Sequence, residues 1–350
     1  MLPRIEIAKE SFDSCSNKLF IVAEGFEKRS LYWISKPNNK TCFTNSIICR
    51  YSPSKVSRFD EMLGFVKERT TNEPIILDYN RFEPTIFEQE LKKKIQEFKD
   101  VEEVIIDISV MSKLLIMIIL YSFKDYNGKI TIIYSEPCEW GPTQERFNNT
   151  IDNKTQGQCV GLSSVGVGNV VRTPNLSSVI MQGCPIFLVA FLSFNEQLIN
   201  VLVNEINPTK LFVVNHRCAD AEWRESAMYR IHEELINDFS NNDAKNNLDA
   251  YMNTFSLLEY EELFVSLAEL YKKNCYHYRI VLSPTGCKLH AVSCALLKLC
   301  CPDIHIEYPT PESYLFDEYS SDEVSNVYQI CFENFRDLIL NLANNAHLNG

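Results

Sequence analysis

Short apolar runs rich in β-branched residues alternate along this chain with segments in which apolar residues recur every three or four positions. The runs predict buried strands and the spaced segments predict amphipathic helices, an order typical of βαβ units around a mostly parallel sheet. In the first half, helices are expected at 60–69 and 85–98, each with one apolar face. The strands predicted there are 19–23, 46–51, 74–78, 104–108 and 130–134.

The second half repeats this order of elements. Helices are predicted at 221–236, 261–272 and 289–299. A further helix is predicted at 324–342, with an apolar face suited to packing on the core or against a protein partner, including a second copy of the chain. The strands predicted in this half are 186–190, 211–215, 254–258, 278–282 and 304–308.

The two halves also match in chemistry. The first strand of each half, beginning near Phe20 and Phe187, runs into a small residue, an aromatic residue and a carboxylate, and the fourth strand runs into a hydroxyl-bearing turn that ends in lysine. We therefore predict an α/β fold of two tandem Rossmann-like, doubly wound, mostly parallel sheets made by internal duplication, with a C-terminal helix. The expected domains are a first half at 1–145, a linker or small hairpin (through 161–171) at 146–183, a second half at 184–318 and the C-terminal helix at 319–350.

Composition narrows the classes of function. The 34 basic and 46 acidic residues give a net charge of −12, which argues against broad binding to duplex nucleic acid but leaves room for a local basic pocket. The longest apolar run, 114–120, is too short to span a bilayer. The first 13 residues include charged side chains at positions where a signal peptide would be apolar. We expect no membrane segment and a cytoplasmic location. The 13 cysteines, many within apolar stretches, are expected to be reduced thiols.

A turn in the second half resembles a phosphate cradle. Ligands of open parallel sheets lie beyond the carboxyl ends of the strands, where the strand order reverses. Ser283, Thr285, Gly286 and Lys288 follow the fourth predicted strand and precede a helix, so they combine hydroxyl donors, a cation and free backbone N–H groups. The alternative is an ordinary turn in which a hydroxyl caps the helix and glycine makes the bend. The Walker spacing of an ATPase is absent.

The first half carries a counterpart of this turn in Ser109, Ser112 and Lys113. Asp107 precedes it and opposes phosphate charge, unless its carboxylate bonds a ribose hydroxyl or a capping N–H. The turn after the first strand, 24–30, includes Arg29, whose guanidinium could bind phosphate through two hydrogen bonds. Alternatively, this turn is an exposed helix start.

Possible metal ligands form only weak patterns in the sequence. His216 with Cys218, and Cys287 with His290 and Cys294, have ligand-like residues but no second pair at zinc spacing, so no metal site is predicted and no cofactor is assigned.

The turns after the first and fourth strands resemble those of CRISPR-associated Rossmann-fold (CARF) domains. The residues that carry the resemblance are Ser283, Thr285, Gly286 and Lys288, with Ser109, Ser112, Lys113 and the 24–30 turn. The resemblance implies a sensor or regulatory component of prokaryotic antiviral defence that binds a nucleotide or cyclic oligonucleotide.

Two other classes of function stay open. One is a nucleotide or nucleic-acid hydrolase with Asp107, Glu24 or Glu27 as general base. The other is a ligand-free interaction subunit whose polar strand ends only cap helices, with contacts made by the C-terminal helix.

Overall fold

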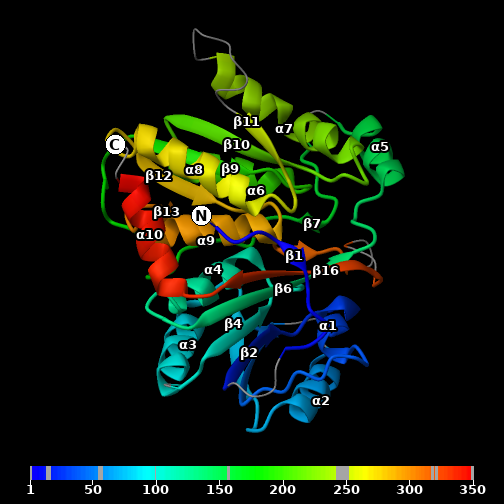
Figure 1. Cartoon of the computed structure of the whole chain (residues 1–350). Helices are drawn as coiled ribbons and strands as arrows, with labels where there is room; N and C mark the ends of the chain where they lie inside the picture. The colour runs from blue at the N-terminus through cyan, green and yellow to red at the C-terminus, as the bar shows by residue number, and fades with distance from the viewer. Residues whose placement is uncertain are drawn as a thin grey trace. The chain divides into compact units, whose positions relative to one another are not determined.

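The computed structural model describes residues 2–12, 17–53, 58–98, 100–155, 158–241, 252–316, 319 and 322–347. The protein is a mixed α/β protein with a large, mostly parallel sheet. The chain forms two compact units (Figure 1). The first unit consists of Met1–Trp140 and Ser320–Asn344, and the second of Gly141–Tyr319 and Asn345–Gly350. Within the described residues, no helix combines the length and the apolar character needed to cross a membrane.

The first unit is built on a seven-stranded sheet in the order β1-β16-β6-β5-β2-β3-β4. The five strands from β2 to β6 are parallel, whereas β16 runs antiparallel to β6 and β1 antiparallel to β16. The strands are β1 (Glu6–Ile7), β2 (Lys18–Ala23), β3 (Asn45–Ser52), β4 (Ile75–Asn80), β5 (Glu103–Asp107), β6 (Lys129–Pro137) and β16 (Val324–Phe332).

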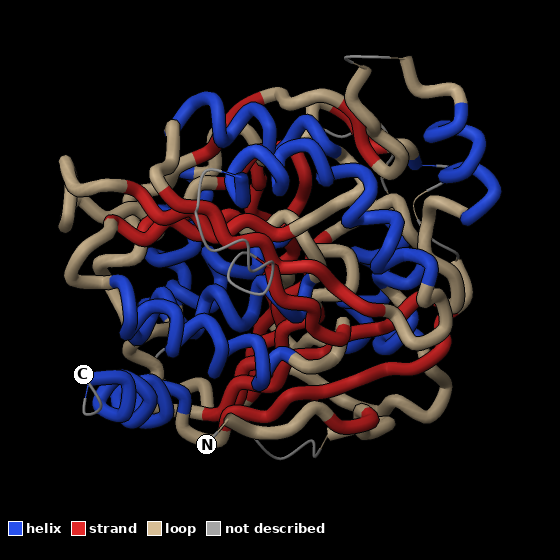
Figure 2. Tube along the Cα trace, turned by 90° about the horizontal axis from the view of Figure 1, so that it is seen from above, coloured by secondary structure: helices blue, strands red, loops and turns tan. Residues whose placement is uncertain are grey.

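Helices flank the strands of this unit (Figure 1), and Figure 2 shows the helices and strands of the whole chain seen from above. One apolar cluster joins α1 and α2 to the sheet around the buried Trp33, where Phe20 and Phe43 stack with ring centroids 4.5 Å apart. Every residue of α4 from Leu114 to Leu120 is buried, which explains the unbroken apolar run in the sequence. The helices are η1 (Lys28–Ser30), α1 (Tyr32–Ser35), α2 (Phe59–Arg69), α3 (Thr85–Glu97), α4 (Lys113–Ser122) and α10 (Phe335–His347).

The second unit has a five-stranded parallel sheet in the order β11-β10-β9-β12-β13. Its strands are β9 (Ile186–Phe191), β10 (Lys210–Arg217), β11 (Met252–Ser256), β12 (Arg279–Ser283) and β13 (His305–Ile306).

The helices of this unit accompany the parallel strands. Both α6 and α7 contribute to one apolar cluster with β9 and β10, and all residues of α9 are buried. The helices are α5 (Gln144–Asp152), α6 (Glu196–Ile206), α7 (Trp223–Asn241), α8 (Tyr260–Asn274) and α9 (Lys288–Cys300).

The strand order reverses at the centre of each parallel set. In the first unit β2 lies between β3 and β5, and in the second unit β9 lies between β10 and β12. Because the chain moves to one side of this first strand and then to the other, the turns after β2 and β5, and after β9 and β12, flank the point of reversal. These are the turns in which the sequence placed its candidate residues.

Two predicted elements are wrong. The hairpin expected through 161–171 does not form, because β7 (Ser164–Val165) pairs with β15 (Ser313–Tyr314) and β8 (Asn169–Val171) pairs with β14 (Tyr308–Thr310). The helix expected over 324–342 begins only at Phe335. Its first part is strand β16, since the free edge of β6 supplies hydrogen bonds that outweigh the helical spacing of the apolar residues.

Candidate functional site

The turns after β2 and β5 lie against one another in the first unit. A Cβ atom on Gly25 would lie 2.8 Å from Cγ2 and 2.9 Å from Cβ of Val110. Real Cβ atoms do not approach so closely, so glycine at position 25 permits this contact. The structure therefore brings together the two turns that the sequence assigned to one site.

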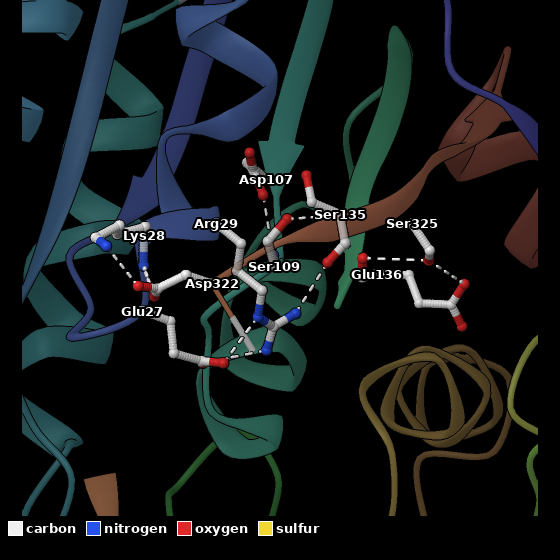
Figure 3. A network of polar contacts seen from close by, with 9 residues as sticks. All are labelled: Glu27, Lys28, Arg29, Asp107, Ser109, Ser135, Glu136, Asp322 and Ser325. Atoms are coloured by element: carbon white, nitrogen blue, oxygen red, sulfur yellow. Dashed lines mark hydrogen bonds and ion pairs between the residues drawn. The ribbon is translucent and has the colours of Figure 1, made fainter. Parts of the chain in front are cut away.

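Arg29 is enclosed within the first of these turns (Figure 3). Its Nε and Nη2 atoms donate to the two carboxylate oxygens of Glu27 at 2.8 and 3.1 Å, and its Nη1 donates to the Ser135 carbonyl at 2.9 Å. The guanidinium also lies 5.7 Å from the ring centroid of Trp140. This differs from the phosphate contact predicted for Arg29, because the planar group is already bound on several sides and has no exposed surface.

Asp107 ends β5 and organises the turn that follows. Its Oδ1 accepts the Ser109 backbone N–H at 2.9 Å, and the Ser109 hydroxyl accepts the Ser135 backbone N–H at 2.8 Å (Figure 3). The carboxylate thus bonds a backbone N–H of its own turn, which precedes the helix cap Ser112 and so is not the capping N–H expected from the sequence. Its Oδ2 is buried and has no hydrogen-bond partner within the described residues.

Burial raises the pKa of Asp107 to about 6, although the hydrogen bonds from Ser109 and the charge of Arg29 oppose this shift. The other two acidic candidates, Glu24 and Glu27, are also buried. Glu27 is committed to Arg29, and the Glu24 backbone N–H donates to the Cys49 carbonyl at 3.0 Å. Asp107 therefore has a carboxyl group whose pKa is shifted towards neutrality.

Ser112 caps helix α4. Its Oγ accepts the Leu115 backbone N–H at 3.2 Å, and its own backbone N–H donates to the hydroxyl of Tyr51 at 2.7 Å. Lys113 is the first residue of the helix and is half-buried. The serine is therefore a helix cap, as the simpler interpretation of this turn predicted, and it places a lysine at the helix N-terminus.

The turn after β12 in the second unit is packed against the end of β9. The Thr285 hydroxyl donates to the Phe191 carbonyl, and a Cβ atom on Gly286 would lie 3.3 Å from Cβ of Phe191. Ser283 is fully buried, and its Oγ has no partner within the described residues. Lys288, the first residue of α9, is also buried. The four residues predicted to form a cradle are therefore together on one turn.

Cys287 and His290 complete this turn. Cys287 is the N-cap of α9, and its Sγ accepts the His290 backbone N–H at 3.4 Å. The Nε2 atom of His290 lies 3.2 Å from the Ser256 carbonyl oxygen at the end of β11. Burial lowers the pKa of His290 to about 4, so the imidazole is neutral at physiological pH. The sequence analysis considered His290 only as a metal ligand and rejected that role. Its position three residues after the helix cap Cys287 is the sequence feature that could have assigned it to this turn.

The N-termini of α4 and α9 differ in charge from those of the other helices. Among the helices of eight or more residues in the described part of the chain, α4 and α9 have no acidic residue in the first turn, and each begins with a lysine. A cation at this end of a helix opposes the macrodipole, whereas a bound anion would be favoured there. The helices with Asp or Glu in the first turn are α2, α3, α5, α6, α7, α8 and α10.

The described residues contain no group of three or more His, Cys, Asp or Glu side chains placed to hold a metal ion. Comparison with models of known protein families and with curated protein sequences found no match to this chain.

Proposed function

We propose that the protein binds a nucleotide or oligonucleotide-like anion at its strand ends and acts as a sensor or regulatory component. The proposal treats the two units as tandem Rossmann-like halves related by duplication. It is supported by their common arrangement, in which the first parallel strand lies between the second and the fourth. The CARF-like turns then suggest a role in prokaryotic antiviral defence.

One observation carries the binding proposal. The helix after the fourth parallel strand of each unit begins with a lysine, Lys113 or Lys288, directly after a side-chain cap, and has no acidic residue in its first turn. The helix N-terminus and the lysine that begins the helix are then two sources of positive charge on the same turn. An anion bound there would interact favourably with both, which offsets the cost of placing like charges together.

The two turns would contribute unequally. The second unit combines Lys288 with Gly286 and hydroxyl side chains, and no acidic residue occurs within its turn. The first unit keeps Asp107 at the strand end, where an ionised carboxylate would repel phosphate. We therefore expect the second unit to bind the anion more tightly. Ligand binding would act as a signal if it favours one of two conformations of the chain.

The test is calorimetric titration of the purified protein with linear and cyclic oligoribonucleotides, after native mass spectrometry has shown whether a ligand is already bound. The double variant Lys113→Gln/Lys288→Gln should lower affinity at least tenfold. Lys93→Gln, an exposed lysine of α3, is the matched control and should bind like the wild type. Unchanged affinity in the double variant, or no binding by the wild type, would overturn the proposal.

A hydrolase is the second proposal, and Asp107 is the observation that favours it. A carboxyl group with a pKa of about 6 and one unpartnered oxygen has the properties of a general base near neutral pH. Nucleotide turnover that disappears in Asp107→Asn, with binding retained, would support catalysis. Binding without turnover would leave the sensor proposal.

A further inference from the structure

His290 provides an unused hydrogen-bond acceptor at the N-terminus of α9. A backbone carbonyl can only accept a hydrogen bond, so the contact of Nε2 with the Ser256 carbonyl places the ring proton on Nε2. The lone pair is then on Nδ1. This atom is buried and has no hydrogen-bond partner within the described residues, and the residue as a whole is 1% exposed.

The acceptor faces the turn that we assign to the anion. A Cβ atom on Gly286 would lie 3.7 Å from Nδ1 and 3.3 Å from Cβ of Phe191, so Nδ1 lies beside the backbone of this glycine. The rings of Phe191 and His216 lie against the imidazole, with centroids 5.9 and 6.4 Å from its own. Because Gly286 and Cys287 are only half-buried, this is also the part of the turn that solvent can reach.

These groups set two requirements on a ligand. The helix N-terminus and Lys288 favour negative charge, whereas the lone pair of Nδ1 repels an oxygen that carries no proton. The burial of His290 prevents the histidine from supplying the missing proton near neutral pH. A ligand that satisfies both requirements has an O–H group within the anionic group itself or directly beside it.

We propose that the turn of the second unit selects a phosphate monoester in its monoanionic form, whose P–OH donates to Nδ1 of His290 while its charged oxygens face the N-terminus of α9. This inference rests on the proposed function and narrows it. A terminal phosphate, as on a linear nucleotide or oligonucleotide, has a second pKa of about 6 and so retains such a proton at mildly acidic pH. A phosphodiester, as in a cyclic oligonucleotide, has no P–OH and is bound more weakly.

The structure provides a second unpartnered group on the same turn. The buried hydroxyl of Ser283 can donate or accept, so it can bond to either kind of phosphate oxygen. In contact with the phosphate it would add affinity without distinguishing the protonation states. Discrimination depends on His290, which can only accept.

Inorganic phosphate and sulfate are the probes that isolate this effect, because they have similar shapes and sulfate carries no proton near neutral pH. Calorimetry at pH 6.5 should give at least tenfold tighter binding of phosphate than of sulfate, and tighter binding of adenosine 5′-monophosphate than of its 3′,5′-cyclic form. His290→Leu removes the acceptor, so phosphate and sulfate should then bind with about equal affinity, mainly because phosphate binds more weakly.

His232→Leu is the matched control. His232 is likewise buried, with Nε2 at 2.9 Å from the Ser193 carbonyl and Nδ1 unpartnered, but it lies on α7. This variant should keep the wild-type preference. If His290→Leu does not fold, Gly286→Ala provides the second test, since its methyl group would lie 3.7 Å from Nδ1 and should hinder a phosphate oxygen bonded to this atom, which would weaken phosphate binding.

The outcomes separate the two proposals. Equal binding of phosphate and sulfate by the wild type, or a preference that survives His290→Leu, overturns the role of His290 and leaves the anion site standing. Binding of neither anion and of no nucleotide overturns the anion site and this inference together.

Discussion

The carboxylate of Glu27 accepts hydrogen bonds from both Nε and Nη2 of Arg29, although both side chains are buried and lie only two residues apart. The pair is formed within a single turn, and Arg29 Nη1 joins this turn to the Ser135 carbonyl of β6. Burial of two charges is costly unless both are fully bonded. The pair therefore fixes the conformation of the turn after β2 as long as both members are present.

We predict that Glu27→Gln lowers the free energy of unfolding by about 3 kcal/mol, because it leaves the charge of Arg29 buried without its counter-charge. Chemical denaturation measures the effect. Asp322→Asn is the control, since it breaks the exposed ion pair with Lys28, whose side chains are 61% and 51% exposed, and should change stability by less than about 1 kcal/mol. Equal effects of the two substitutions would show that the buried pair does not hold the turn.

Gly25 and Gly64 should respond to alanine with opposite signs. Gly25→Ala forces a methyl group against Val110 and should cost about 1–3 kcal/mol, because the turns after β2 and β5 must separate. Gly64 lies within α2 and nothing lies within 4 Å of the position of its Cβ, so alanine there should stabilise the protein by about 0.5–1 kcal/mol. Thermal unfolding of both variants checks the prediction, and a stabilised Gly25→Ala protein would contradict the close approach of the turns.

Much of the fold could be predicted because buried parallel strands leave a clear pattern. Strand β9 is apolar throughout and β10 has an apolar run at 211–214, and the predicted segments 186–190 and 211–215 fall inside these strands. A helix was expected after the fourth strand, but the bounds of α4 were not predicted, since seven consecutive buried residues leave no amphipathic period. Strand β16 was predicted as a helix, because it pairs with residues of β6 that lie 187 to 202 positions earlier in the chain, and this pairing has no local signal.

In the candidate site, too, the features with a local sequence signal could be predicted and the contacts between distant segments could not. The predicted strand and helix on either side placed Thr285, Gly286 and Lys288 on one turn before a helix, and in the structure they lie between β12 and α9 or at the start of α9. The partners that complete the site come from distant segments, such as the Ser256 carbonyl that sets the tautomer of His290. Arg29 is likewise held by a contact with a distant segment, the Ser135 carbonyl of β6. The sequence does not show this contact, so Arg29 was predicted to bind a ligand.

Lys113 should reduce the stability of the protein without its ligand. A cation at a helix N-terminus opposes the macrodipole, so Lys113→Gln should raise the free energy of unfolding by about 0.3–1 kcal/mol while weakening anion binding. Lys94→Gln supplies the opposite control. Lys94 lies in the last turn of α3, where a cation is favoured, and its loss should slightly lower stability. If Lys113→Gln destabilises the protein as Lys94→Gln does, the lysine serves the fold and not a ligand.

Asp107 should make stability depend on pH in a direction opposite to that of most carboxylates. Its pKa is raised from the ordinary value of 3.8 to about 6, so the folded protein binds this proton more tightly than the unfolded chain does. The resulting stabilisation is fully present below about pH 4 and is lost as the pH rises through about 6. Over this range the contribution of Asp107 should fall by roughly 1–3 kcal/mol.

Asp107→Asn tests this directly, because the amide cannot ionise and its oxygen can still accept the Ser109 N–H. The free energy of unfolding of the variant minus that of the wild type should therefore increase by roughly 1–3 kcal/mol between pH 4.5 and pH 7.5. Asp78→Asn should show an almost constant difference over the same range, since the pKa of Asp78 is lowered by its hydrogen bond to Arg50 and its stabilisation is already complete above the ordinary carboxyl pKa of 3.8. A difference for Asp107→Asn that is constant with pH would mean that this carboxyl titrates normally, and the proposal of Asp107 as a general base near neutral pH would then lose its physical basis.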